Sequence, residues 1–264
     1  MKFFIPVICL AALLTSLPAD EIKPANQSFT AGKFSFSVTP TGIIENLKNG
    51  DIELVSSVRL TVKPVRGESD TENPYIVQGN KYSTASLAVK QEGDLQQITI
   101  QGCLANALYK AADYTEILSV SPAGIKVETI VTLLRDIHVL TWENFRSLLL
   151  LPNALLDGST ARIMNVAGAD KTFTFPEKSS NQRYPAFFGC KAFVLELPNM
   201  GIKITNEDNA YMLLFDGTWH SSQETANRLL IFRPTSVRYS EQPVLLEKGT
   251  LLKWTWSVFE HHED

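Results

Sequence analysis

The stretch from Ile137 to Arg146 holds the densest group of side chains that could act on a ligand. If this stretch is one β-strand, alternate side chains point to the same side of the sheet. One face then carries His138, Leu140, Trp142, Asn144 and Arg146. Such a face suits a sugar, because an indole stacks on the C–H face of the ring while polar groups bind its hydroxyls. The alternative interpretation is an ordinary solvated face with one tryptophan under a loop.

A second candidate group follows the apolar run Tyr211–Phe215. In the predicted turn after that run, Trp219 could serve as a stacking platform and His220 as a general base, since the pKa of histidine lies near neutrality. His138 is the other candidate catalytic residue. Arg183 and Tyr184, in a polar loop, could cover a ligand. The alternative interpretation is that this turn has only a structural role, with Trp219 as an anchor.

The sequence lacks the short motifs of several enzyme classes. It contains no nucleophile elbow, phosphate-binding loop, HExxH zinc motif or dinucleotide fingerprint. We therefore expect no cofactor and no metal. Cys103 and Cys190 could form a disulfide or could be two buried thiols, and the spacing does not decide between these.

Alternation of apolar and polar residues dominates the chain and predicts β-strands. It is clearest in Phe34–Val38, in Val58–Val62 and in Leu252–Val258, where Trp254 and Trp256 should face the core. Pro-x-Gly turns, as in 121–124, predict hairpins. Helical periodicity is scarce, and 104–113 could be a short helix or a loop. We expect an all-β fold, a large antiparallel two-layer β-sandwich with helix below about a tenth of the residues.

The amino terminus has the layout of a secretory signal peptide. Lys2 precedes an apolar run that is too short to span a bilayer, and Ala19 is a small residue at the expected cleavage point. Removal of 1–19 leaves one predicted domain, 20–264, with 23 Lys and Arg against 28 Asp and Glu, a net charge of −5. We expect a secreted or periplasmic monomer without a membrane span. The net charge is mildly negative and the chain has no run of basic residues, so the sequence does not indicate nucleic-acid binding.

Three segments resemble the galactose-mutarotase-like supersandwich domains: GKFSFSVTPTGIIENLKNGDIELV, YTEILSVSPAGIKVETIVTLL and KGTLLKWTWSVF. The resemblance implies a carbohydrate ligand on the concave face of one sheet. The chain departs from the pattern of catalytic mutarotases, because it lacks their Asn-Leu-Thr-Asn/His-type block. The sequence therefore favours a secreted carbohydrate-binding or carbohydrate-processing protein, and leaves open whether it is an enzyme. The alternative is a non-catalytic periplasmic structural or protein-interaction domain that binds through a sheet edge.

Overall fold

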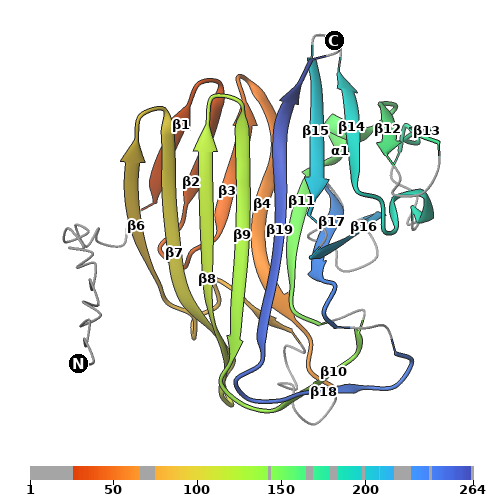
Figure 1. Cartoon of the computed structure of the whole chain (residues 1–264). Coiled ribbons are helices and arrows are strands. Elements are labelled where there is room, and N and C mark those ends of the chain that lie inside the picture. Colours follow the sequence, from red (N-terminus) through yellow and green to blue (C-terminus); the bar gives the residue numbers. More distant parts are fainter. Residues whose placement is uncertain are drawn as a thin grey trace, which may run out of the picture.

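Two large antiparallel sheets pack face to face in a computed structural model of the chain (Figure 1). The structure describes residues 26–65, 75–141, 144–164, 169–178, 184–197, 200–207, 209–216, 227–237 and 240–262. Strand makes up 65% and helix 4%, which confirms the predicted all-β sandwich and its low helix content.

The first sheet has eight strands. In order across the sheet they are β1 (Gln27–Ala31), β2 (Phe34–Val38), β3 (Ile44–Asn49), β4 (Ile52–Val62), β11 (Arg146–Pro152), β17 (Asn227–Pro234) and β16 (Ala210–Asp216), with β5 (Ile76–Val77) paired to β4. The short α1 (Asn153–Leu156) follows β11.

The second sheet has nine strands. Their order is β13 (Lys171–Thr174), β12 (Thr160–Met164), β14 (Ala192–Leu197), β15 (Met200–Asn206), β19 (Leu251–His261), β9 (Gly124–Leu133), β8 (Lys110–Ser121), β7 (Leu95–Ala105) and β6 (Ala85–Glu92). A separate ribbon pairs β10 (Ile137–Val139) with β18 (Val244–Leu246).

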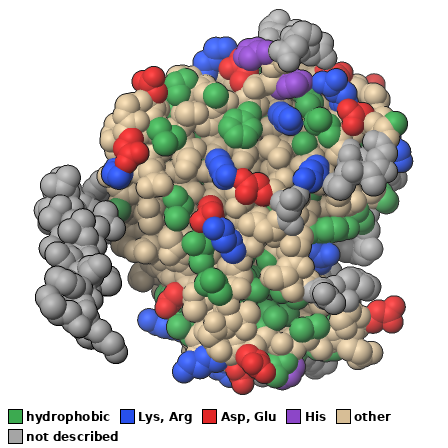
Figure 2. Space-filling model, viewed as in Figure 1, with side chains coloured by type: hydrophobic (Ala, Val, Ile, Leu, Met, Phe, Trp, Pro, Cys, Tyr) green, Lys and Arg blue, Asp and Glu red, His purple; other side chains and the backbone are tan. Residues whose placement is uncertain are grey.

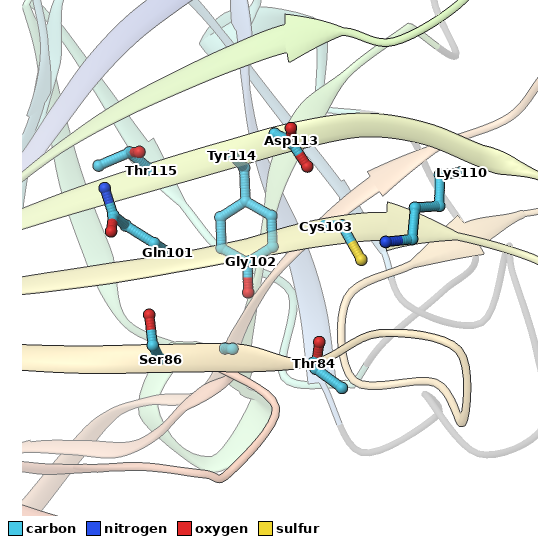
Figure 3. A pocket seen from close by; sticks show the side chains of 10 residues that line it. Thr84, Ser86, Gln101, Gly102, Cys103, Lys110, Asp113, Tyr114 and Thr115 are labelled. Carbon is cyan, nitrogen blue, oxygen red and sulfur yellow. The ribbon is translucent and has the colours of Figure 1, made fainter. Parts of the chain in front are cut away.

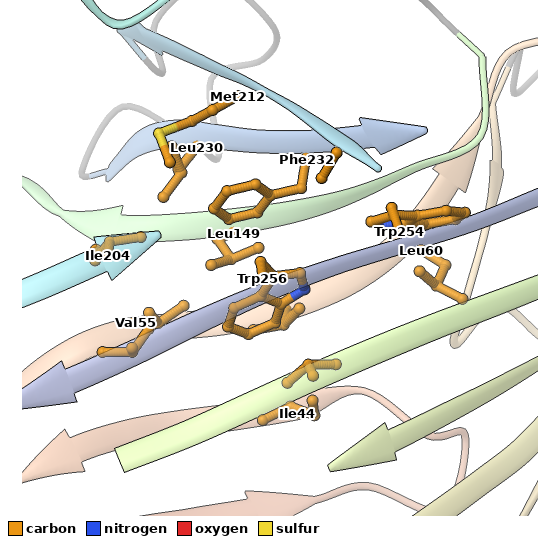
Figure 4. Close-up of a cluster of buried hydrophobic side chains, with 14 of the residues drawn as sticks. Ile44, Val55, Leu60, Leu149, Ile204, Met212, Leu230, Phe232, Trp254 and Trp256 are labelled. Carbon is orange, nitrogen blue, oxygen red and sulfur yellow. The ribbon is translucent and has the colours of Figure 1, made fainter. Parts of the chain in front are cut away.

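Large apolar side chains from both sheets meet in one core (Figure 4). Trp254 and Trp256 of β19 are fully buried, as the alternation predicts. The Trp256 ring stacks on Phe232 of the other sheet at 5.7 Å between centroids. The Trp254 indole donates a hydrogen bond of 2.9 Å to Ser147 Oγ, so the buried N–H is satisfied across the two layers.

The β16 edge of the eight-stranded sheet is covered by the chain around η2 (Pro185–Phe187). The backbone N–H of Tyr184 donates to Leu214 O at 3.2 Å, and that of Gly189 donates to Met212 O at 3.0 Å. These bonds occupy the free side of β16, an apolar strand whose uncovered edge would invite association with another chain.

The structure corrects one local expectation and decides another that the sequence left open. The stretch 137–146 is not one strand: β10 ends at Val139 and pairs with β18, whereas β11 begins at Arg146 between β4 and β17. Alternation across 137–146 therefore does not define a shared face. Of the two alternatives for 104–113, the helix is excluded and the loop is found: the stretch forms the end of β7, a tight connection and the start of β8.

The face of the molecule shown in Figure 2 carries interspersed charges. Ion pairs join Lys126 to Glu207 and Lys253 to Glu128, and they contribute little to stability at such exposed positions. Within the described part of the chain, no helix is long and apolar enough to cross a membrane.

Candidate functional site

The structure places the predicted residues of the Ile137–Arg146 stretch in different environments. His138 is exposed on β10, where its backbone oxygen accepts a hydrogen bond from Val65. Asn144 is fully buried, and neither atom of its side-chain amide bonds to a described residue. Arg146 is only 5% exposed; its Nε donates to Thr61 Oγ1 at 3.1 Å.

Tyr184 is a core residue rather than a surface cover. It is 3% exposed, and its hydroxyl accepts a hydrogen bond of 3.1 Å from Arg228 Nε. Arg228 pairs with Leu151 in the β11–β17 ladder, five residues along β11 from Arg146. The backbone of Tyr184 lies beyond β16, since its N–H bonds Leu214 O, so three strand spacings of about 4.8 Å, or about 14 Å, separate it from β11, which holds Arg146. The structure does not bring these two predicted ligand-binding residues together.

Four further predicted site residues lie outside the described residues: Trp142, Arg183, Trp219 and His220.

A pocket of about 540 Å³ lies on the nine-stranded sheet, over β6, β7 and β8 (Figure 3). Its lining is mostly polar: Thr84, Ala85, Ser86, Gln101, Gly102, Cys103, Lys110, Asp113, Tyr114 and Thr115. The strand register explains this grouping, because Gln101 lies opposite both Ser86 and Thr115, and Cys103 lies opposite Asp113. Side chains of neighbouring strands that share a register and a face are within contact distance.

Two asparagines shape the chain beside the pocket. Asn106 Oδ1 accepts hydrogen bonds of 2.9 Å from the backbone N–H groups of Leu108 and Tyr109, which closes the tight β7–β8 connection. Asn80 Nδ2 donates to Ala105 O at 2.7 Å, and its Oδ1 accepts from Tyr82 N at 2.8 Å. Side-chain amides that bond nearby backbone in this way are typical of turns.

The backbone of Tyr82 lies beside the pocket. Tyr82 is 39% exposed, and its backbone oxygen contacts Sγ of Cys103, a lining residue, at 4.0 Å. Lys81 Nζ lies 5.0 Å from the centre of the Tyr82 ring. The pocket thus combines hydroxyl, amide and charged groups, and the backbone of the exposed Tyr82 lies next to it.

The absence of a side chain at Gly102 permits the packing beneath the pocket. A Cβ at this position would lie 2.5 Å from the backbone oxygen of Thr84 and 2.6 Å from the Tyr114 hydroxyl. Figure 3 shows the Tyr114 ring extending from β8 across β7 at Gly102. Tyr114 is 2% exposed, so it connects the pocket lining to the core.

A buried polar cluster continues from Tyr114 into the core. Gln78 Nε2 lies 2.9 Å from Gly42 O, 2.9 Å from the Tyr114 hydroxyl and 3.2 Å from Glu116 Oε2. Burial raises the pKa of Glu116 to about 7, although the neighbouring Gln78 amide and Thr129 hydroxyl favour its charged form. Burial and the nearby Glu116 also raise the pKa of Tyr114 above its usual value.

The described residues contain no group of three or more His, Cys, Asp or Glu side chains placed to hold a metal ion. Sequence reasoning missed the pocket because each lining residue is an ordinary polar residue of a strand. The asparagine turn signals at Asn80 and Asn106 could have located its two neighbouring connections.

Comparison with known proteins identifies the fold. No family model matches the sequence, and no curated protein matches it significantly. Among solved structures, an Escherichia coli K12 protein described as a candidate aldose 1-epimerase matches with a TM-score of 0.60 at 10% identity, over 90% of this chain and 99% of that one. A galactose mutarotase-like protein from Clostridium acetobutylicum matches with a TM-score of 0.57 at 11% identity, over 92% and 99%. A galactose mutarotase-like protein from Lactobacillus casei gives 0.53 at 13% identity, over 90% and 100%.

These matches confirm the predicted likeness to galactose-mutarotase-like sandwich domains at the level of the fold.

Proposed function

We propose that this protein binds carbohydrate in the pocket over β6, β7 and β8. The pocket itself carries the proposal: its volume of about 540 Å³ suits a small ligand, and polar side chains from three strands converge on it. The mutarotase-like fold is consistent with a sugar ligand, but a fold by itself hosts many functions.

The lining offers the contacts that a sugar ring needs. Asp113 can accept hydrogen bonds from two hydroxyls, Lys110 can donate, and Gln101 can do both. Tyr82 is exposed and its backbone contacts the lining residue Cys103, so a turn of its side chain toward the pocket would let the phenol ring stack on the C–H face of the sugar. A single such site supports an affinity in the millimolar to micromolar range, about −4 to −8 kcal/mol.

A glycan array on the mature protein tests the proposal, followed by calorimetry on any glycan retained. Asp113→Asn and Tyr82→Ala should each weaken binding about tenfold or more, because each removes one specific contact. Asp94→Asn, in the exposed β6–β7 turn at the far end of β7, is the matched control and should bind normally. A protein that retains no glycan would instead favour a protein-interaction domain, whereas variants that bind glycan as well as the parent would show that the glycan site is not this pocket.

Export is a second part of the proposal. The charged, apolar and small-residue segments that end at Ala19 support removal of a signal peptide and a secreted or periplasmic location. Intact-mass analysis of protein recovered outside the cytoplasm should find Asp20 as the first residue. Recovery of a chain that retains Met1–Ala19 would contradict this.

A further inference from the structure

We propose that the protonation state of Glu116 sets how firmly Tyr114 is held beneath the pocket, and thereby regulates the pocket. The binding part of this inference rests on the proposed function; the coupling between Glu116 and Tyr114 does not.

The coupling follows from a count of hydrogens on Gln78. The backbone N–H of Leu60 donates to Gln78 Oε1 at 2.9 Å, which fixes the amide so that Nε2 faces the cluster. Nε2 carries two hydrogens but lies within hydrogen-bond distance of three acceptors. One hydrogen goes to Gly42 O, so Tyr114 and Glu116 compete for the other.

The charge on Glu116 decides that competition. A carboxylate is a much stronger acceptor than a phenol oxygen, so ionised Glu116 takes the second hydrogen of Gln78. Neutral Glu116 leaves that hydrogen to Tyr114. The Tyr114 hydroxyl then accepts a bond of 2.9 Å from Gln78 Nε2 and also donates over the longer distance of 3.4 Å to Thr41 O; with Glu116 ionised, only the contact with Thr41 O remains.

Few other groups can interfere with this titration. The side chains that face the cluster are Ile100 from β7, Thr129 from β9, and Leu60 and Gln78 from the β4–β5 side, and none of these titrates. The titratable neighbours are Tyr114 itself and Cys103, which acts on Tyr114. Asp113 and Lys110 are exposed at the pocket. Since burial places the pKa of Glu116 near 7, the exchange falls within the physiological range.

Tyr114 transmits the change because its ring packs against Gly102 at the pocket lining. Loss of the hydroxyl bond frees the ring to move at the one position of β7 where no side chain supports it. We therefore expect a firm pocket below about pH 7 and a looser one above.

Tyrosine labelled with ¹³C at Cζ tests the coupling by NMR, with Tyr114→Phe to assign its signal among the seven tyrosines. The Tyr114 shift should titrate with a midpoint near pH 7 in the parent and stay flat in Glu116→Gln, which is neutral at every pH. Glu128→Gln, a change at a partly exposed position on the neighbouring strand β9, should titrate like the parent. A Tyr114 signal that titrates equally in Glu116→Gln and the parent would overturn the inference.

Alkylation of Cys103 by iodoacetamide gives a second readout, because Cys103 lines the pocket. Alkylation speeds up with pH in both proteins because more thiolate forms. Dividing the parent rate by the Glu116→Gln rate removes this shared pH dependence. This ratio should rise about fivefold between about pH 5.5 and pH 8.5, as expected for the loss of one neutral hydrogen bond. A constant ratio would count against a change at the pocket. If Glu116→Gln does not fold, Tyr114→Phe takes its place, because it removes the hydroxyl that competes with Glu116 for the Gln78 hydrogen and so leaves the ring without this bond at both pH values.

Affinity for D-galactose as a probe, measured at both pH values, completes the test. Weaker galactose binding at the higher pH in the parent, but not in Glu116→Gln, supports regulation of the pocket by Glu116. Equal binding at both values overturns regulation while leaving the proposed function intact. Absence of galactose binding together with a Glu116-dependent Tyr114 titration would count against the proposed function only.

Discussion

At the scale of single residues, the buried acid Glu116 links stability to pH. Its carboxyl group has a pKa of about 7 in the folded protein, against an ordinary value of 4.5. The raised pKa means that the folded state binds the proton more tightly than the unfolded chain does. Stability is therefore full below about pH 4.5 and falls as the pH rises to about 7, by an amount on the order of 3 kcal/mol.

Urea unfolding at about pH 5 and pH 8.5 measures this loss. Glu116→Gln should remove most of the difference between the two values, since its amide does not titrate. Glu128→Gln on the outer side of β9 should keep the parent's dependence. An unchanged difference in Glu116→Gln would mean that another group causes the loss of stability.

A substitution at Tyr184 tests whether this residue stabilises the core or binds a ligand. Arg228 is completely buried; it bonds Tyr184, forms an ion pair of 2.8 Å with Asp157 and lies 5.3 Å from the Phe175 ring centre. Tyr184→Phe should cost about 1–3 kcal/mol of unfolding free energy, because it removes a bond to a buried charge. Glycan affinity at the pocket should not change. Weaker glycan binding at undiminished stability would instead restore Tyr184 as a ligand-binding residue.

At the scale of elements, alternation predicts strands well and strand partners poorly. The run Leu252–Val258 is one strand with its tryptophans buried, as expected from its pattern. The equally regular run Ile137–Arg146 crosses from β10 to β11, because the chain changes partner from β18 to β4 and β17. Alternation with a period of two predicts which side chains of a strand are buried. It does not predict which other strand pairs with it.

The candidate pocket shows the same limit. Ser86, Gln101 and Asp113 are far apart in sequence, and only the register of β6, β7 and β8 places them on one surface. Each residue alone resembles an ordinary solvated position. The sequence therefore identifies the sandwich and its likeness in fold to galactose-mutarotase-like domains, whereas the pocket requires the pairing of three strands.

Gly102 tests how those three strands approach one another. Gly102→Ala would place a methyl group 2.5 Å from a backbone oxygen and 2.6 Å from the Tyr114 hydroxyl, so we expect a loss of about 1–3 kcal/mol and a displaced Tyr114 ring. Gly93→Ala is the control in the same hairpin: its Cβ meets open space, and only its positive φ of 60° is strained, at a cost of about 1 kcal/mol. Denaturant unfolding compares the two. Equal losses of unfolding free energy in the two variants would show that β6 and the Tyr114 ring shift enough to accommodate the methyl group at position 102.

At the scale of the whole molecule, the two sheets extend far enough to separate the cysteines. Cys103 lies on β7, and Cys190 precedes β14, with Sγ 3.4 Å from Met212 of the other sheet. Four strand spacings separate β7 from β15, the neighbour of β14, or about 19 Å at about 4.8 Å each. Both thiols are free and buried, which answers the open question of their pairing.

If the protein is exported as proposed, it should keep two reduced thiols even in an oxidising compartment. A disulfide requires the Cα atoms to come within about 7 Å, which the sandwich forbids without unfolding. Burial also raises the pKa of Cys190 to about 12, so little reactive thiolate forms there. Ellman titration of the mature protein in denaturant without reductant should count two thiols, whereas the folded protein should react slowly. A count of zero with an intact mass two daltons lower would show that the two cysteines pair, and would require a rearrangement of both sheets.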